Sequence, residues 1–201
     1  MNGIIQELKV LLKTKSIGTN SDRALLLDFQ ATLETKPEKA IKLEKDALAQ
    51  IENITADNAR LVSNLHANLG GLYRINDHPD LAREHMEKSI SLLDQFNLLH
   101  INDSIPQIAN YAMFLTEQQE PERGISELQK LSGIIKEYHS DDCLDYAKVQ
   151  ETLGTIYLMT ANLPQAKTHF KRAFKIYEKI WADEPKMIEA KYQEIQELYP
   201  Q

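Results

Sequence analysis

The 201-residue chain has little of what turns, cross-links and membrane spans require. Glycine and proline number 7 each and aromatic residues make up 7%, so turn-forming residues are too few for a many-stranded β fold, which needs a turn about every 8–12 residues. A single cysteine, Cys143, excludes an internal disulfide and a cysteine-based zinc site. No run approaches about 18 uncharged apolar residues, so the sequence predicts no membrane-spanning helix.

The net charge and the N-terminal residues indicate which partners and which location to expect. The net charge is −7 at pH 7, which argues against nucleic acid or an anionic membrane surface as the main partner. The first residues lack both a basic leader and a small-residue cleavage site, so a secretory signal is not expected. We therefore expect a cytoplasmic protein with no nucleic-acid partner and no membrane partner.

What the sequence does contain is a helix-forming composition and an internal repeat. Ala, Leu, Glu, Lys and Gln dominate, as is typical of helices. The pattern Leu-Gly-x-x-Tyr occurs around Gly70 and again around Gly154, which are 84 residues apart, or twice 42. Small residues recur every 42 residues, at Ala40, Ala82, Gly124 and Ala166. Prolines recur at the same interval, at Pro37, Pro79, Pro121 and Pro164, although Pro164 is displaced by one residue.

This period predicts a helix hairpin repeated four times. Proline is tolerated in the first turn of a helix, so each proline is expected to begin a second helix. Small residues on facing sides let two helix backbones approach closely, so the shared pattern is interpreted as a packing constraint. We expect first helices near 21–34, 57–76, 104–118 and 143–160, and second helices near 37–52, 79–96, 121–138 and 163–182.

One domain should hold these hairpins, because no boundary divides the chain. It comprises an N-terminal helix in residues 1–19, repeats at about 20–55, 56–101, 102–141 and 142–184, and a charged capping helix in residues 185–201. Polar residues suited to helix N-caps lie near the first-helix starts: Asp22, Asp57, Ser104 and Asp142.

The repeat resembles the tetratricopeptide repeat, whose Leu-Gly-x-x-Tyr and Ala-x-x-x-Phe patterns are packing signatures. Leu153, Gly154, Tyr157, Ala166 and Phe170 match it closely. The 42-residue length resembles the repeats of kinesin light chains and of bacterial peptide-sensing regulators. The resemblance implies an all-α, right-handed α-solenoid in which the first helices line a concave groove that binds peptides or helices. The charged helix in residues 185–201 is expected to cap its C-terminal end.

No motif predicts catalysis, a cofactor or a metal. His85 and His169 lie at equivalent positions two hairpins apart, too far to share an ion, and the stretch around Cys143 is interpreted as a capped loop. The sequence has no HExxH, no glycine-rich phosphate loop and no nucleophile elbow. We therefore expect a non-enzymatic protein.

The groove face can be assigned by helical spacing. In the kinesin-light-chain type, the resemblance implies that an Asn before the Leu-Gly pair contacts the backbone of a bound peptide, and Asn68 and Asn110 match it. Arg74 and Lys148 would favour a ligand with an acidic residue or a free C-terminus. The alternative is that Glu117 and Glu151 cancel these charges and that the Asn residues are merely solvated. The predicted peptide-binding set is Asn64, Asn68, Arg74, Asn110, Met113, Lys148 and Met159.

The first repeat interrupts this face with Leu26, Phe29 and Leu33. Either the amphipathic N-terminal helix, near residues 3–15, covers them, or they form an interface. The leading hypothesis is therefore a module that binds a protein or peptide partner in its groove. The alternatives are a ligand-sensing domain of a larger signalling protein, and a scaffold that self-associates, for example as a homodimer through a terminal repeat.

Overall fold

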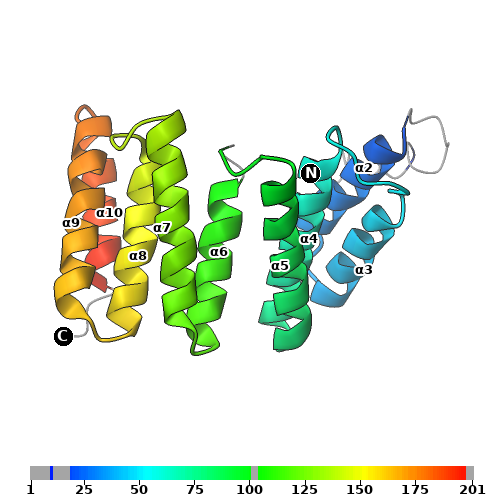
Figure 1. The fold of residues 1–201 in the computed structure, drawn as a ribbon, viewed down its shortest axis with the longest axis horizontal. Helices are drawn as coiled ribbons and strands as arrows, with labels where there is room; N and C mark the ends of the chain where they lie inside the picture. The colour runs from blue at the N-terminus through cyan, green and yellow to red at the C-terminus, as the bar shows by residue number, and fades with distance from the viewer. Residues whose placement is uncertain (1–9, 11–18, 101–103, 198–201) are drawn as a thin grey trace. The chain divides into compact units, whose positions relative to one another are not determined.

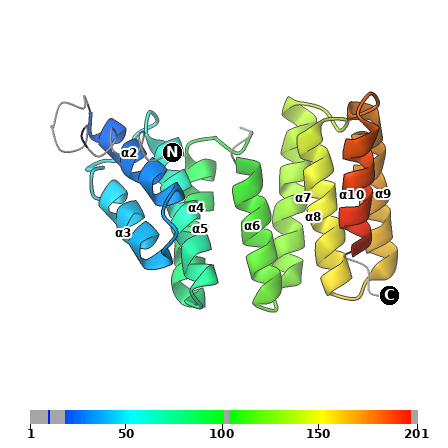
Figure 2. The same cartoon turned by 180° about the vertical axis from the view of Figure 1, so that it is seen from behind.

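A computed structural model describes residue 10 and residues 19–100 and 104–197, and the described residues form helices and no strand. The chain divides into two compact units, residues 1–98 and 99–201. Figures 1 and 2 show the helices of each unit from opposite sides. The predicted N-terminal helix near residues 3–15 falls almost entirely outside the described residues.

The first unit holds two helix hairpins. Helix α2 (Asn20–Thr32) packs on α3 (Pro37–Leu48), and α4 (Ala59–Ile75) packs on α5 (Pro79–Gln95). Helix α4 also contacts α2 and α3, so the two hairpins stack into one body. A buried cluster of Ala24, Ala47 and Leu65 lies where these helices meet.

The second unit holds two further hairpins and a final helix. Helix α6 (Ser104–Glu117) packs on α7 (Pro121–Tyr138), and α8 (Leu144–Met159) packs on α9 (Leu163–Ile180). The first helices α6 and α8 are in contact, and α10 (Pro185–Glu197) packs on α9. In Figure 2 helix α10, in red, lies in front of α9.

The four predicted hairpins are confirmed, and each boundary falls within a few residues of its expected place. Proline lies in the first turn of every second helix, as the sequence predicted. The turn before it carries a left-handed residue that is not glycine at Asp77, Gln119 and Ala161, with φ of 58°, 63° and 58°. These three positions follow the 42-residue period. Each turn is closed by a backbone bond back to the first helix, such as that from the Asn162 amide to the Tyr157 carbonyl at 2.7 Å.

Close approach of the paired helices explains the small residues. A Cβ atom added at Gly124 would lie 2.6 Å from the carbonyl oxygen of Ala112 in the facing helix, and one at Gly154 would lie 2.9 Å from the Phe170 ring. At Gly70 the added atom would lie 2.5 Å from Met86 Cγ. Glycine and alanine therefore persist at these positions because the helices leave no room for a larger group.

The predicted caps are correct only in part. Asp22 stands in the first turn of α2, where it completes a capping box with the cap residue Thr19. Cys143 caps α8, because its Sγ accepts from the Tyr146 amide at 3.4 Å, whereas Asp142 forms an ion pair with Lys179. At α4 the cap position belongs to Asn58, the residue after Asp57.

Candidate functional site

The predicted binding residues of the first unit lie on α4 and are already engaged with the protein. Asn68 is half-buried, and its Nδ2 donates to Asp28 Oδ1 at 2.9 Å and to Glu44 Oε1 at 3.1 Å. Asn64 and Arg74 also have partners within the chain. Asn68 therefore joins three helices, α2, α3 and α4, in addition to any contact with a ligand.

Glu44 carries a buried carboxyl group, since the residue is only 1% exposed. Burial, followed by the nearby Asp28 carboxylate, raises the pKa of Glu44 to about 8. Its Oε2 is buried without a hydrogen-bond partner among the described residues, so no donor stabilises a negative charge on that atom. The pKa of Asp28 is also raised, chiefly by burial. Burial and the neighbouring carboxylate thus both favour the neutral form of Glu44.

In the second unit the predicted residues lie on the neighbouring first helices α6 and α8. Asn110 and Lys148 are exposed, Met113 is half-buried, and Met159 is 49% exposed. The Lys148 ammonium lies 3.7 Å from Asp145 Oδ1 on its own helix, a surface pair of small energetic value. This face therefore presents an amide, a cation and an apolar side chain to solvent.

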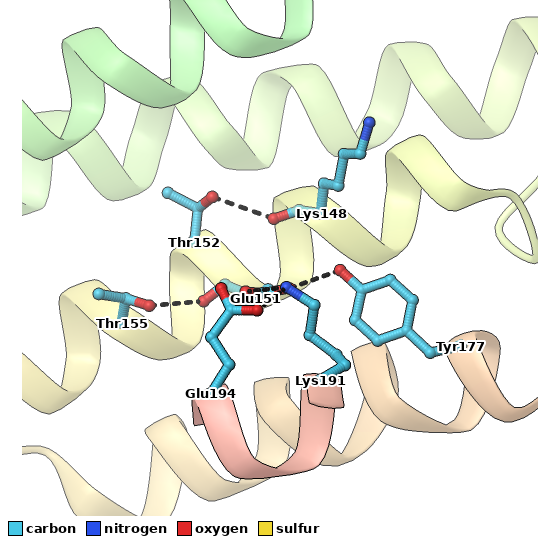
Figure 3. Close-up of polar contacts among 7 residues, drawn as sticks. All are labelled: Lys148, Glu151, Thr152, Thr155, Tyr177, Lys191 and Glu194. Carbon is cyan, nitrogen blue, oxygen red and sulfur yellow. Dashed lines mark hydrogen bonds and ion pairs between the residues drawn. The ribbon is translucent and has the colours of Figure 1, made fainter. Parts of the chain in front are cut away.

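Two threonines on α8 have their hydroxyl protons occupied. Thr152 Oγ1 donates to the Lys148 carbonyl at 3.0 Å, and Thr155 Oγ1 donates to the Glu151 carbonyl at 3.1 Å. Figure 3 shows both bonds. Each hydroxyl can then offer a ligand only its oxygen lone pairs. On this face the donors available to a ligand come from Lys148 and Asn110.

A polar cluster between α8, α9 and α10 was not predicted as a unit. Tyr177 donates to Glu151 Oε2 at 2.5 Å, and Lys191 Nζ lies 3.2 Å from Glu151 Oε1 and 2.6 Å from Glu194 Oε2. In Figure 3 these side chains converge between the helices, while Lys148 points away from them. Burial, followed by the hydrogen bond to Glu151, raises the pKa of Tyr177. The Glu151 carboxylate thus bonds to Tyr177 and to Lys191 of α10. The hypothesis that Glu151 only neutralises cations of the groove does not account for these bonds.

The histidines at equivalent repeat positions pack on tyrosines. His85 stacks on Tyr73 with ring centroids 5.4 Å apart, and His169 stacks on Tyr157 at 5.3 Å. His85 also meets His66, Nδ1 to Nδ1, at 2.8 Å. Among the described residues no group of three or more His, Cys, Asp or Glu side chains is placed to hold a metal ion.

The apolar side chains of the first repeat differ in exposure. Leu26 and Leu33 are half-buried, whereas Leu25 is 55% and Phe29 44% exposed. The covering segment that the sequence predicts lies outside the described residues, so its contact with them stays a prediction. Within the part of the chain that is described, no helix has the length and apolar character needed to cross a membrane.

Comparison with known proteins places the chain in a repeat class. The tetratricopeptide-repeat family model matches residues 104–179, which span α6 to α9. No relative was found among curated proteins.

Solved structures of similar fold come from several sources. BtubC (BKLC) from P. vanneervenii is 19% identical with a TM-score of 0.69, over 87% of this chain and 70% of that one. The nearly identical TPR-like repeats of a kinesin light chain from Podosopora anserina are 14% identical with a TM-score of 0.70, over 89% and 90% of the two chains. The MamA protein is 15% identical with a TM-score of 0.59, over 91% and 85%.

These matches confirm the predicted resemblance and fold class: residues 104–179 match the tetratricopeptide-repeat family, and the chain has an all-α, helical-repeat solenoid fold. Repeats of this family are protein-interaction modules, and that general class of function follows from the match. The ligand and the residues that bind it are a separate matter.

Proposed function

We propose that this protein is a non-enzymatic interaction module that binds a peptide or partner segment on the face of its first helices. The observation that carries the proposal is the exposed row on α6 and α8, where Asn110, Lys148 and Met159 lie on adjacent helices of the family-matched region. A peptide can form hydrogen bonds with the exposed amide and cationic groups and apolar contacts with the side chain beside them. A surface that only keeps the protein hydrated has no need of this combination.

Each residue of this row has a separate part in the proposal. Asn110 can donate to a peptide carbonyl and accept from a peptide N–H, so it holds an extended backbone whatever the side chains. Lys148 selects an acidic side chain or a free C-terminal carboxylate, because its ammonium group is exposed and its pair with Asp145, at 3.7 Å, is weak. Met113 and Met159 supply adaptable apolar contacts.

In the first unit the corresponding residues are Asn64, Asn68 and Arg74. The amide donors of Asn68 are committed to Asp28 and Glu44. We therefore propose that a peptide bound on this unit meets the amide oxygen of Asn68 and not its N–H groups. Arg74, near the end of α4, supplies the cation of this unit.

The test begins with a random peptide library displayed on phage and selected against the immobilised full-length protein. The binding of synthetic copies of the selected peptides is then measured by fluorescence anisotropy for the wild type, Asn110→Ala and Lys148→Glu. We expect acidic peptides, and a loss of at least about tenfold for each variant, since each lost hydrogen bond or ion pair costs about 1.4 kcal/mol or more.

Lys171→Glu is the matched control. Lys171 is exposed on the second helix α9, and the substitution changes the net charge by the same amount as Lys148→Glu does. It should retain wild-type affinity. Equal affinity for all variants would refute the proposed face. An equal loss of peptide affinity in Lys148→Glu and Lys171→Glu would show that only the net charge matters. That result would also refute the proposed face.

A further inference from the structure

In the 42-residue period of the sequence, helix α10 falls where the first helix of a fifth repeat would begin. Ile195 follows Leu153 by 42 residues, and Lys191 follows Val149 by the same interval. Leu153 is 1% exposed and Val149 is 0% exposed within α8. Helix α10 therefore matches the repeat at its isoleucine, but it carries a charge where α8 carries a buried aliphatic side chain.

The positive charge of Lys191 on α10 pairs with Glu151, a residue that also differs from the other repeats at its position. Glu151 occupies the position that is alanine in the two preceding first helices, at Ala67 and Ala109. Its two carboxylate oxygens accept from Tyr177 and from Lys191. The side chains of Lys191 and Glu151 are only 20% and 17% exposed, so their ion pair is partly desolvated.

The Lys191 ammonium has further partners that fix its place. It lies 5.6 Å from the centroid of the Tyr177 ring and 2.6 Å from Glu194 Oε2 on its own helix. The Glu151 carboxylate on α8 and the ring of Tyr177 on α9 thus both attract the Lys191 ammonium of α10 (Figure 3).

The apolar part of the same contact is small. Ile195 is the only buried residue of α10 and joins a cluster with Ala166 and Phe170. Tyr192 adds an edge contact to Phe174, with ring centroids 5.3 Å apart, and is itself 49% exposed. By contrast, α8 buries seven residues. A helix of 13 residues is marginal by itself in water, so its attachment depends on these few contacts.

We propose that the surface beneath α10 is a docking site for an amphipathic helix of a partner protein that carries Lys or Arg four residues before Ile or Leu, and that α10 occupies this site in the free protein. In Figure 3 the Lys148 side chain points away from this surface, so the two proposed sites use different side chains. The ligand must be helical, because the isoleucine and the lysine are one helical turn apart. It must be basic at that position, because Glu151 would otherwise be left partly buried without its cation.

The probe is a fluorescently labelled peptide with the sequence of residues 185–197, added to the full-length protein. In the wild type the attached α10 competes with it, and binding should be weak. In Lys191→Glu the attached helix is repelled by Glu151, so the peptide should bind at least about tenfold more tightly. Glu189→Lys is the control, because Glu189 is exposed on α10, and it should bind as weakly as the wild type does.

Two further measurements establish where the peptide binds. Adding Glu151→Ala to the Lys191→Glu protein should abolish its gain in binding, and a peptide that itself carries Lys191→Glu should not bind. If Lys191→Glu proves unfolded by circular dichroism, the milder Ile195→Ala takes its place with the same expected gain. A folded variant with no gain in peptide binding overturns the proposal. A variant that dimerises in sedimentation without binding peptide overturns it too, since the occupant would then be a second copy of the chain.

Discussion

The Nδ1 atoms of His66 and His85 lie 2.8 Å apart, on the facing helices α4 and α5. At this distance one ring must accept a hydrogen bond through a neutral nitrogen. Burial, followed by the charges of His85 and Lys88, lowers the pKa of His66 to about 4, and burial lowers the pKa of His85. The equivalent pair in the fourth repeat is Gln150 and His169, with Gln150 Oε1 2.9 Å from His169 Nδ1. A glutamine therefore makes the same bond without a second titrating ring.

This comparison predicts that acid destabilises the His66 hairpin. Because the folded-state pKa of His66 lies below its ordinary 6.5, the stability that it contributes is present above pH 6.5 and is lost as the pH falls toward 4. His66→Gln should therefore lose less stability than the wild type over this window. Urea unfolding at several pH values would measure it, with the exposed His78→Gln as control. Parallel curves for the wild type and His66→Gln would contradict the prediction.

Alkaline pH should act on the same unit through Glu44. Its raised pKa means that the stabilising contribution is fully present below the ordinary 4.5 and is lost as the pH rises through about 8. Glu44→Gln keeps a neutral donor toward Asp28, so its stability relative to the wild type should increase from pH 6 to pH 9. Thermal unfolding would show this, and Glu38→Gln, an exposed change on the same helix, should show no such trend. A carbon NMR titration in which Glu44 ionises near its ordinary pKa would rule the interpretation out.

Two glycines of α7 should respond oppositely to alanine. A Cβ atom at Gly124 would press on the Ala112 backbone at 2.6 Å, whereas one at Gly133 meets nothing within 4 Å. Gly124→Ala should destabilise by about 1–3 kcal/mol through overpacking. Gly133→Ala should stabilise by about 0.5–1 kcal/mol, because alanine is the better helix former. The midpoints of urea unfolding report both, and shifts of the same sign would be incompatible with the packing described.

Asn68 and Asn110 should differ in their effect on stability. Asn68→Ala removes the donor that Asp28 and Glu44 share, so it should destabilise by about 1–3 kcal/mol. Asn110 is exposed, and Asn110→Ala should change stability by less than about 0.5 kcal/mol. Equal unfolding midpoints for the two variants would show that the Asn68 bonds are not maintained in solution.

The sequence by itself determined the hairpins, because their causes are local or periodic. A proline can begin a helix but cannot lie within one without breaking a bond, so the prolines place the starts of the second helices. Small residues at a fixed interval indicate where helices touch, and their effect depends on size alone. These signals predicted the helix boundaries, the repeat family and the shared packing at Gly70 and Gly154.

Only the tertiary structure decided which partner each polar side chain meets. Helical spacing places Asn68 on a face of α4, but the carboxyl groups of Asp28 and Glu44 come from two other helices. Lys191 and Glu151 are separated by 40 residues, and nothing in either local sequence pairs them. The left-handed turns at Asp77, Gln119 and Ala161 carry three different side chains, so no residue type marked them. Contacts between side chains of different helices depend on how the helices pack. The spacing of residues in the sequence indicates on which face of a helix a side chain lies, but not which residue lies opposite it.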